Sequence, residues 1–289
     1  MGKAGCIDLF ELPDVLPPAF DTQAISGEIA EAGLDWTQHY SEYQSGAWWT
    51  CTLLGRSRRA TDGEVTDTAG PVATDALERL PKIGKLLQGL GLHYMMVRLA
   101  RLDPGGALWE HKDYQDLRDV ARQRIHLPIE TTPEAFMVTG GSKYHLAPET
   151  LWAFHPTKPH GSCNLGHCAR IHLLIDAYED QTMKTIFARA IPRISVQMTK
   201  LAPEALMERV KNLRQSHRAT GEKADRGTGS SALMDWERSA LLLYFQFSIP
   251  DGALYNALEL VCAQAGDHKR ATFWRGRRNM VLGDGLAHV

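Results

Sequence analysis

The chain has 289 residues, of which 44% are hydrophobic, so it is long enough to bury a substantial core in one or two domains. Its 32 Lys and Arg residues nearly balance its 34 Asp and Glu residues, which argues against the concentrated basic face of a nucleic-acid-binding protein. No stretch is close to the roughly 18 or more consecutive apolar residues that a membrane span requires, so we expect no membrane partner.

The first ninety residues mix short apolar runs with turn signals. Residues 1–20 contain early acidic side chains and no apolar core of the kind found in secretory signals, so we expect no signal peptide. Residues 45–55 are rich in β-forming residues and lie between glycines, which predicts a strand. Residues 72–91 have apolar side chains at helical spacing, interrupted by Pro81, which predicts one or two short helices.

From residue 92 to residue 178 the sequence consists of short β-forming segments separated by turn signals. Closely spaced strands with such punctuation predict a sandwich or jelly roll rather than alternating β–α units. The predicted strands are 93–102, 122–130, 134–147, 150–156 and 169–178.

The remainder of the chain has a helical character. Residues 202–215 are amphipathic with a charged face, and a polar connector over 218–232 precedes two largely buried helices over 233–247 and 251–266. The basic segment 269–279 is expected to form a solvated surface. Exposed faces of these helices can either cap the β region or form a homodimer contact, and the sequence leaves both open.

The cysteines are odd in number and scattered, which predicts free thiols in a reducing compartment rather than a disulfide framework. We therefore expect a cytoplasmic protein. The five residues are Cys6, Cys51, Cys163, Cys168 and Cys262.

Two pairs of ionisable residues stand two positions apart within the β region: His111 with Asp113, and Arg124 with His126. In a strand, residues i and i+2 lie on the same face, so the first pair offers an imidazole and a carboxylate to one point. His160, at the end of another β segment, can supply a third ligand. Two imidazoles and one carboxylate form the facial triad of non-haem Fe(II) oxygenases, which leaves coordination positions open for a 2-oxo acid and O₂.

Arg170 lies on the predicted strand that follows His160 and shares a face with His172. A guanidinium there can hold the remote carboxylate of a 2-oxo acid such as 2-oxoglutarate by a charge-assisted pair. Because unpaired charges are costly in a protein interior, several polar residues on one face are understandable if that face lines a barrel that holds an ion and an anion.

A cluster of nitrogen and sulfur donors raises an alternative, a zinc site. Its spacing is tighter than that of usual zinc knuckles, and it would leave the pair of His111 and Asp113 without a purpose. The donors would be His160, Cys163, His167 and Cys168.

The segments RLDPGGALWEHKDY, RIHLPIETTP, LWAFHPTKPHGSCNLG and ARIHLLID resemble the aspartyl/asparaginyl β-hydroxylase family of Fe(II)- and 2-oxoglutarate-dependent dioxygenases, over about residues 93–178. An upstream element with Tyr43, Gly46 and Trp48 is similar to one in bacterial L-proline cis-4-hydroxylases of that family, as is the length of the helical C-terminal region. The resemblance implies a mainly β fold with a double-stranded β-helix (jelly-roll, cupin-like) core and flanking helices. We expect this domain over 1–179 and a helical region over 180–289.

The resemblance also implies a role for each polar residue. It implies Arg170 as the anchor for the distal carboxylate of 2-oxoglutarate, and it places an Arg-x-His element close to that cosubstrate. The residues of this element are Arg124 and His126. The implied iron ligands are His111, Asp113 and His160.

Substrate-contacting positions transfer least between members of a family. Our candidates are Trp48, facing the substrate, and Arg98 and Arg118, as partners for a substrate carboxylate. The implied activity is hydroxylation of an unactivated C–H bond of a free amino acid or close derivative, with proline expected first and succinate and CO₂ released. Two alternatives stay open: the same chemistry on a peptide-, carrier- or lipid-bound substrate, and a cupin-like protein that binds a metal or ligand without oxygenation.

Overall fold

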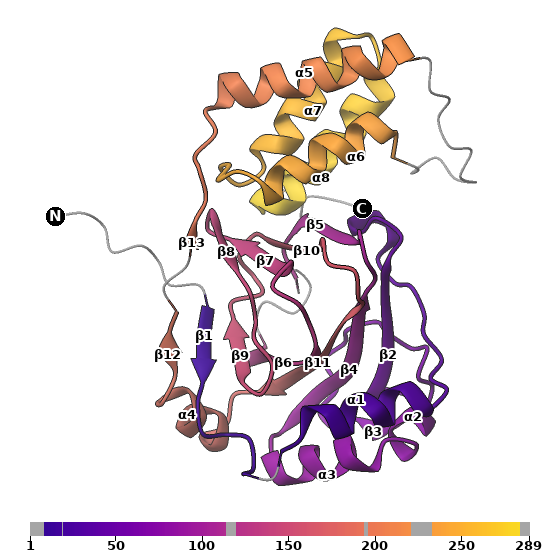
Figure 1. Ribbon diagram of the computed structural model, residues 1–289, viewed down its shortest axis with the longest axis vertical. Helices are drawn as coiled ribbons and strands as arrows, with labels where there is room; N and C mark the ends of the chain where they lie inside the picture. The colour runs from indigo at the N-terminus through magenta and orange to yellow at the C-terminus, as the bar shows by residue number, and fades with distance from the viewer. Residues whose placement is uncertain (1–8, 19, 114–119, 194–195, 221–232, 284–289) are drawn as a thin grey trace, which may run out of the picture.

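Two antiparallel sheets face each other in the computed structural model, which describes residues 9–18, 20–113, 120–193, 196–220 and 233–283 (Figure 1). The larger sheet has the strand order β12 (Ile191–Pro192), β1 (Leu9–Leu12), β9 (Leu151–Phe154), β6 (Arg122–Glu130), β11 (Arg170–Tyr178), β4 (Tyr94–Leu102), β2 (Trp48–Gly55) and β3 (Val72–Ala73). The smaller sheet has the order β13 (Val196–Gln197), β8 (Ser142–Tyr144), β7 (Ala135–Thr139), β10 (His160–Asn164) and β5 (Ala107–His111). The predicted jelly-roll class with flanking helices is confirmed.

The alternation of side chains along β11 separates an apolar face of the larger sheet from a polar one. Ile171, Leu173 and Ile175 belong to the largest core cluster of that sheet, on the side covered by helices. Arg170 and His172 point to the opposite side, toward the smaller sheet. Because neighbouring strands are in register, the polar residues of β6 and β4 lie beside those of β11 and form one continuous face.

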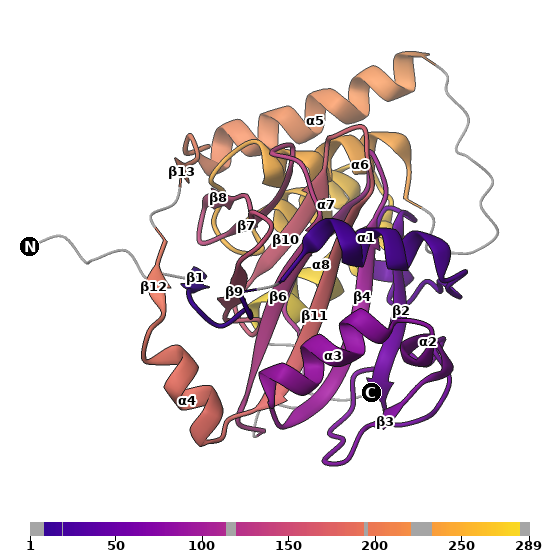
Figure 2. The same cartoon turned by 60° about the horizontal axis from the view of Figure 1, so that its bottom comes forward.

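Helices α1 (Thr22–Glu31), α2 (Asp75–Glu78) and α3 (Pro81–Leu90) cover the apolar face, and Figure 2 shows α1 and α3 crossing it. Pro81 occupies the first turn of α3, where its missing N–H costs nothing, and Gly91 ends the helix with a φ of 58°. The prediction of one or two short helices over 72–91 is confirmed: there are two, and Pro81 begins the second.

The chain after residue 180 first forms α4 (Gln181–Phe187) and then contributes the two short strands β12 and β13 to the sheets. A helical bundle follows and packs on the outer side of the smaller sheet, sharing a core cluster with its strands (Figure 1). The division after residue 179 stays a prediction. The bundle consists of α5 (Pro203–Thr220), α6 (Asp235–Leu241), the 3-10 helix η3 (Leu242–Phe245), α7 (Ala253–Gln264) and α8 (His268–Leu282).

The basic segment 269–279, which we expected to form a solvated surface, lies within α8 and does so only in part, since Lys269 and Arg275 are exposed and one stripe of the helix is buried. Ala271, Trp274 and Arg277 are buried along one stripe of this helix, because their spacing brings them to the side that faces the rest of the protein. The connector expected over 218–232 lies outside the described residues beyond Thr220. No helix in the described part of the chain is both long and apolar enough to cross a membrane.

Candidate metal centre and active-site cavity

A cavity of about 370 Å³ lies between the two sheets, on the polar face of the larger one. Its lining combines side chains of β2, β4, β5, β6, β10 and β11 with one residue of α8. Most of the candidate site residues identified in the sequence line this cavity. They are Trp48, Arg98, His111, Asp113, Arg124, His126, His160 and Arg170. Arg118, the remaining candidate, lies outside the described residues.

His111, Asp113 and His160 form a compact group in which one ligand atom of each lies within 4.8 Å of the others. Antiparallel pairing of β5 with β10 places the two histidines opposite each other. The strand ends at His111, so Asp113 stands in the following bend, where its backbone N–H donates to the carbonyl of Pro156 over 2.9 Å. Its carboxylate lies 3.3 Å from His111 Nε2 and 3.8 Å from His160 Nε2.

Backbone carbonyls orient both imidazoles. Nδ1 of His111 lies 2.6 Å from the carbonyl of Trp109, and Nδ1 of His160 lies 2.9 Å from that of Lys158. A carbonyl only accepts hydrogen bonds, so each Nδ1 carries a proton, and Nε2 is the atom whose lone pair a neutral ring offers to a metal. Burial, with the nearby His111, lowers the pKa of His160 to about 3, which keeps that ring neutral.

Asp113 is held as a carboxylate. Burial alone would raise its pKa, but Arg124 and the two histidines outweigh burial and lower the pKa well below its usual range. Arg124 donates to Asp113, and it also binds Asp176 through Nε at 2.9 Å and Nη2 at 3.0 Å. His160 and Asp113 therefore have the protonation states that a divalent cation requires, and the set of two imidazoles and one carboxylate fits iron.

Arg124 was expected near the cosubstrate. The structure places its guanidinium between the carboxylates of Asp113 and Asp176, which neutralise it. Its contact with the metal-site carboxylate indicates that it orients Asp113; a direct contact with 2-oxoglutarate stays a prediction.

Arg170 is a buried cation, and no carboxylate in the described part of the chain pairs with it. Its guanidinium lies 3.0 and 2.9 Å from the ring nitrogens of His172, of which a neutral imidazole can accept only one hydrogen bond. Burial lowers the pKa of Arg170 to about 10. His126 lies beside His172, and its buried Nε2 has no hydrogen-bond partner among the described residues.

Arg98, on β4, is a second buried cation with which no described carboxylate pairs. It is 3% exposed, its Nη1 donates to the carbonyl of Gly63 over 3.3 Å, and its buried Nε has no partner among the described residues. Its guanidinium carbon lies 5.7 Å from the centre of the Trp48 ring. Burial, followed by repulsion from Arg124, lowers the pKa of Arg98. Trp48 and Arg98 thus form one wall of the cavity.

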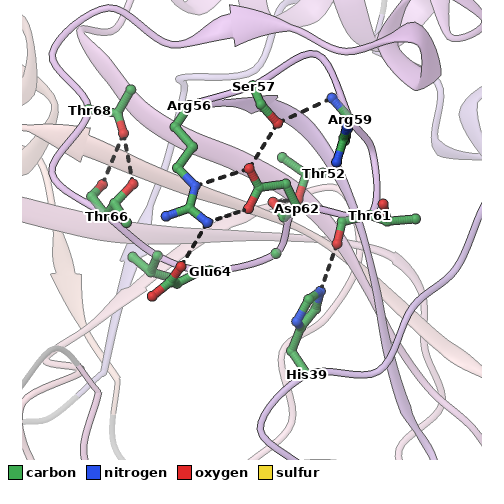
Figure 3. A network of polar contacts seen from close by, with 12 residues as sticks. His39, Thr52, Arg56, Ser57, Arg59, Thr61, Asp62, Glu64, Thr66 and Thr68 are labelled. Atoms are coloured by element: carbon green, nitrogen blue, oxygen red, sulfur yellow. Dashed lines mark hydrogen bonds and ion pairs between the residues drawn. The ribbon is translucent and has the colours of Figure 1, made fainter.

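The loop that carries Gly63 is fixed by a polar network that the sequence did not reveal (Figure 3). Asp62 accepts hydrogen bonds from Arg56 Nε at 3.0 Å and from Ser57 Oγ at 2.8 Å, and Arg56 also pairs with Glu64 at 2.7 Å. This short-range network holds the loop in place, so that the Gly63 carbonyl can position Arg98. Ion pairs between loop residues follow no periodic sequence pattern, so the sequence alone does not predict them.

The alternative zinc site is not assembled. Cys163 is buried on the other face of β10, in the core shared with the C-terminal bundle, and Cys168 is exposed. Alternation along the strand separates Cys163 from His160, which faces the cavity. Within the described ranges, the group of His111, Asp113 and His160 is the one set of three such residues close enough to hold a metal ion.

Comparison with known proteins gives a family match and two curated relatives. A family model described as aspartyl/asparaginyl beta-hydroxylase matches residues 21–180. L-proline cis-3-hydroxylase 2 from Streptomyces sp is 24% identical over 80% of each chain, and L-proline cis-3-hydroxylase 1 is 23% identical over 85% of each chain. A prolyl-4-hydroxylase structure from Pseudomonas putida superposes with a TM-score of 0.38 and 16% identity, covering 61% of this chain and 95% of that one.

Proposed function

Because this chain belongs to the aspartyl/asparaginyl β-hydroxylase family of Fe(II)- and 2-oxoglutarate-dependent dioxygenases, we propose that it hydroxylates a free amino acid, with L-proline as the first substrate to test. Proline is supported by the names of the two curated relatives. The balanced reaction consumes the amino acid, 2-oxoglutarate and O₂, and it yields the hydroxylated amino acid, succinate and CO₂. We assign no ring carbon, because the sequence resembles cis-4-hydroxylases whereas both relatives are named for position 3.

His111, Asp113 and His160 would hold Fe(II), which supplies the activation of O₂ when bound. The protein's own contribution is to fix these ligands. The carbonyls of Trp109 and Lys158 hold the imidazole rings in one tautomer, and Arg124 keeps the Asp113 carboxylate ionised and oriented. Three ligands on one side leave room for a bidentate keto acid and for oxygen.

Arg170 would bind the distal carboxylate of 2-oxoglutarate. A guanidinium binds a carboxylate through two parallel N–H···O bonds, and such pairs are strong where water is excluded. The nearby Nε2 of His126, which is neutral because burial lowers its pKa well below the usual range, can make one further hydrogen bond to the same ligand.

Arg98 would bind the α-carboxylate of the amino acid while the Trp48 ring packs against its apolar part. One observation carries this proposal: a single cavity combines the metal-ligand group with two buried guanidiniums, Arg98 and Arg170, that no described carboxylate neutralises. Two unneutralised cations call for two carboxylates, one from the keto acid and one from the substrate. A residue inside a peptide has no free α-carboxylate, so a free amino acid fits better.

The test is a screen of free amino acids with the Fe(II)-loaded protein, which follows succinate and a product heavier by one oxygen atom. L-proline should be hydroxylated, whereas L-prolinamide, which lacks the carboxylate, should be turned over far more slowly. Arg98→Met should remove this discrimination. Arg101→Met is the matched control, because Arg101 lies on the same strand, is half-exposed and pairs with Asp103 at 2.6 Å. Equal rates with proline and its amide would overturn the assignment of Arg98.

A further inference from the structure

The C-terminal helix α8 reaches the wall of the active-site cavity. Met280, near its end, lines the cavity together with Tyr43, and the Tyr43 hydroxyl lies 3.1 Å from the Met280 sulfur. The bundle also forms hydrogen bonds with β5, the strand that ends at the candidate metal ligand His111. Gly252 N–H donates to the Glu110 carboxylate over 3.0 Å, and Tyr255 Oη donates to the Glu110 carbonyl over 2.6 Å. The residue after Glu110 is His111, so the bundle and the metal centre share one strand.

Tyr43 stands between this helix and the metal centre. Its ring centre lies 5.7 Å from that of His111, at an angle of 45°. Two aromatic rings at this distance attract each other, and a ring packed on one side of an imidazole limits how far that imidazole can turn. The carbonyl of Trp109 holds His111 at Nδ1, and Tyr43 restrains the plane of the same ring.

Arg277 of α8 fixes Tyr43. Its guanidinium carbon lies 4.3 Å from the centre of the Tyr43 ring, and its Nη2 donates to the carbonyl of Glu42, the preceding residue. Arg277 is 7% exposed, and no carboxylate in the described ranges pairs with it. A cation over an aromatic face is attracted most strongly when water is excluded, as here. The burial of this charge is therefore compensated by Tyr43 and the backbone next to it.

We propose that Arg277 is a positioning residue for the metal centre, which acts through Tyr43 on the orientation of His111. This inference rests on the proposed function only in taking His111 as a metal ligand. It gives the C-terminal bundle a part in the site, beyond capping the β sheets.

The test measures the affinity of the metal-free protein for Co(II) by calorimetry, with the metal alone as the probe. Outer-shell substitutions typically weaken metal binding by about 10- to 100-fold, so Arg277→Met should weaken Co(II) binding about tenfold. Arg277→Lys, which keeps a cation over the ring, should recover part of this loss. Arg275→Met is the matched control: Arg275 lies on the same helix, is largely exposed and pairs with Glu259 at 2.8 Å, so its loss should leave Co(II) affinity unchanged.

Tyr43→Ala tests the same link from its other end and does not depend on α8 keeping its fold. It should weaken Co(II) binding as much as Arg277→Met does, and the double variant should be no weaker than either single one, because both remove one interaction. Wild-type affinity in Arg277→Met and Tyr43→Ala, or additive losses in the double variant, would overturn the inference. If the wild-type protein binds Co(II) but hydroxylates no amino acid, the proposed substrate is wrong, whereas the effect of Arg277 on metal affinity is still measured and the inference still tested.

Discussion

Replacing Arg170 by methionine tests the assignment of the 2-oxoglutarate anchor. The substitution keeps an unbranched apolar stem and removes the guanidinium with its charge. Arg170 is 7% exposed, and burial lowers its pKa from the usual arginine value to about 10, which corresponds to about 3 kcal/mol of unfavourable charge burial at neutral pH. A protein keeps such a charge in its interior when a ligand compensates it. We therefore expect Arg170→Met to unfold no earlier than the wild type in the absence of ligand.

The main effect of Arg170→Met should be weaker binding of 2-oxoglutarate. Removing one partner of a buried, hydrogen-bonded charge pair costs about 2–5 kcal/mol. Since about 1.4 kcal/mol corresponds to a tenfold change, affinity should fall at least about 30-fold. The assay is a calorimetric titration of 2-oxoglutarate into anaerobic, Mn(II)-loaded protein, which prevents turnover. Arg101→Met, on the neighbouring strand β4, serves as the control. Affinity within about threefold of the wild type, a change worth under about 1 kcal/mol, would refute the reasoning.

Three further predictions concern the metal, the bundle and the thiols. His160→Ala should abolish Fe(II) binding and turnover while the circular dichroism spectrum stays that of the wild type; retained stoichiometric metal would exclude His160 as a ligand. Glu237 is fully buried and accepts hydrogen bonds from Arg270 Nε at 2.9 Å and Trp274 Nε1 at 3.0 Å, so Glu237→Ala should lower the free energy of unfolding by about 3–5 kcal/mol in urea titrations. Burial raises the pKa of Cys163 to about 12, so at pH 8 its thiol stays protonated and should resist iodoacetamide, whereas exposed Cys168 should react; peptide mapping by mass that finds Cys163 labelled in the native protein would contradict this.

The sequence alone determined the strand-rich core and the residues of its polar face. The period of two along β6 and β11 places Arg124 with His126, and Arg170 with His172, on one side of a sheet, whatever the details of packing. The family membership predicted from four short segments is confirmed by the match over residues 21–180. These features are local, because they depend on spacing within a strand or on short motifs.

The tertiary structure decided how those charges are paired. Only the register of β11 against β6 sets Asp176 beside Arg124, which commits that guanidinium to two carboxylates and leaves Arg170 without one among the described residues. Register is fixed by how the two faces of the sheet are buried, so a single strand's sequence does not contain it.

The basic segment of α8 shows most clearly that the burial of a side chain depends on tertiary packing. As a sequence it has the composition of a solvated surface, and two of its arginines, Arg275 and Arg278, pair with Glu259. Arg277 is buried because the bundle packs on the smaller sheet and brings that one turn of helix over Tyr43, a residue more than two hundred positions earlier in the chain. Composition reports how soluble a segment would be by itself, whereas the burial of one side chain depends on what the rest of the chain places against it.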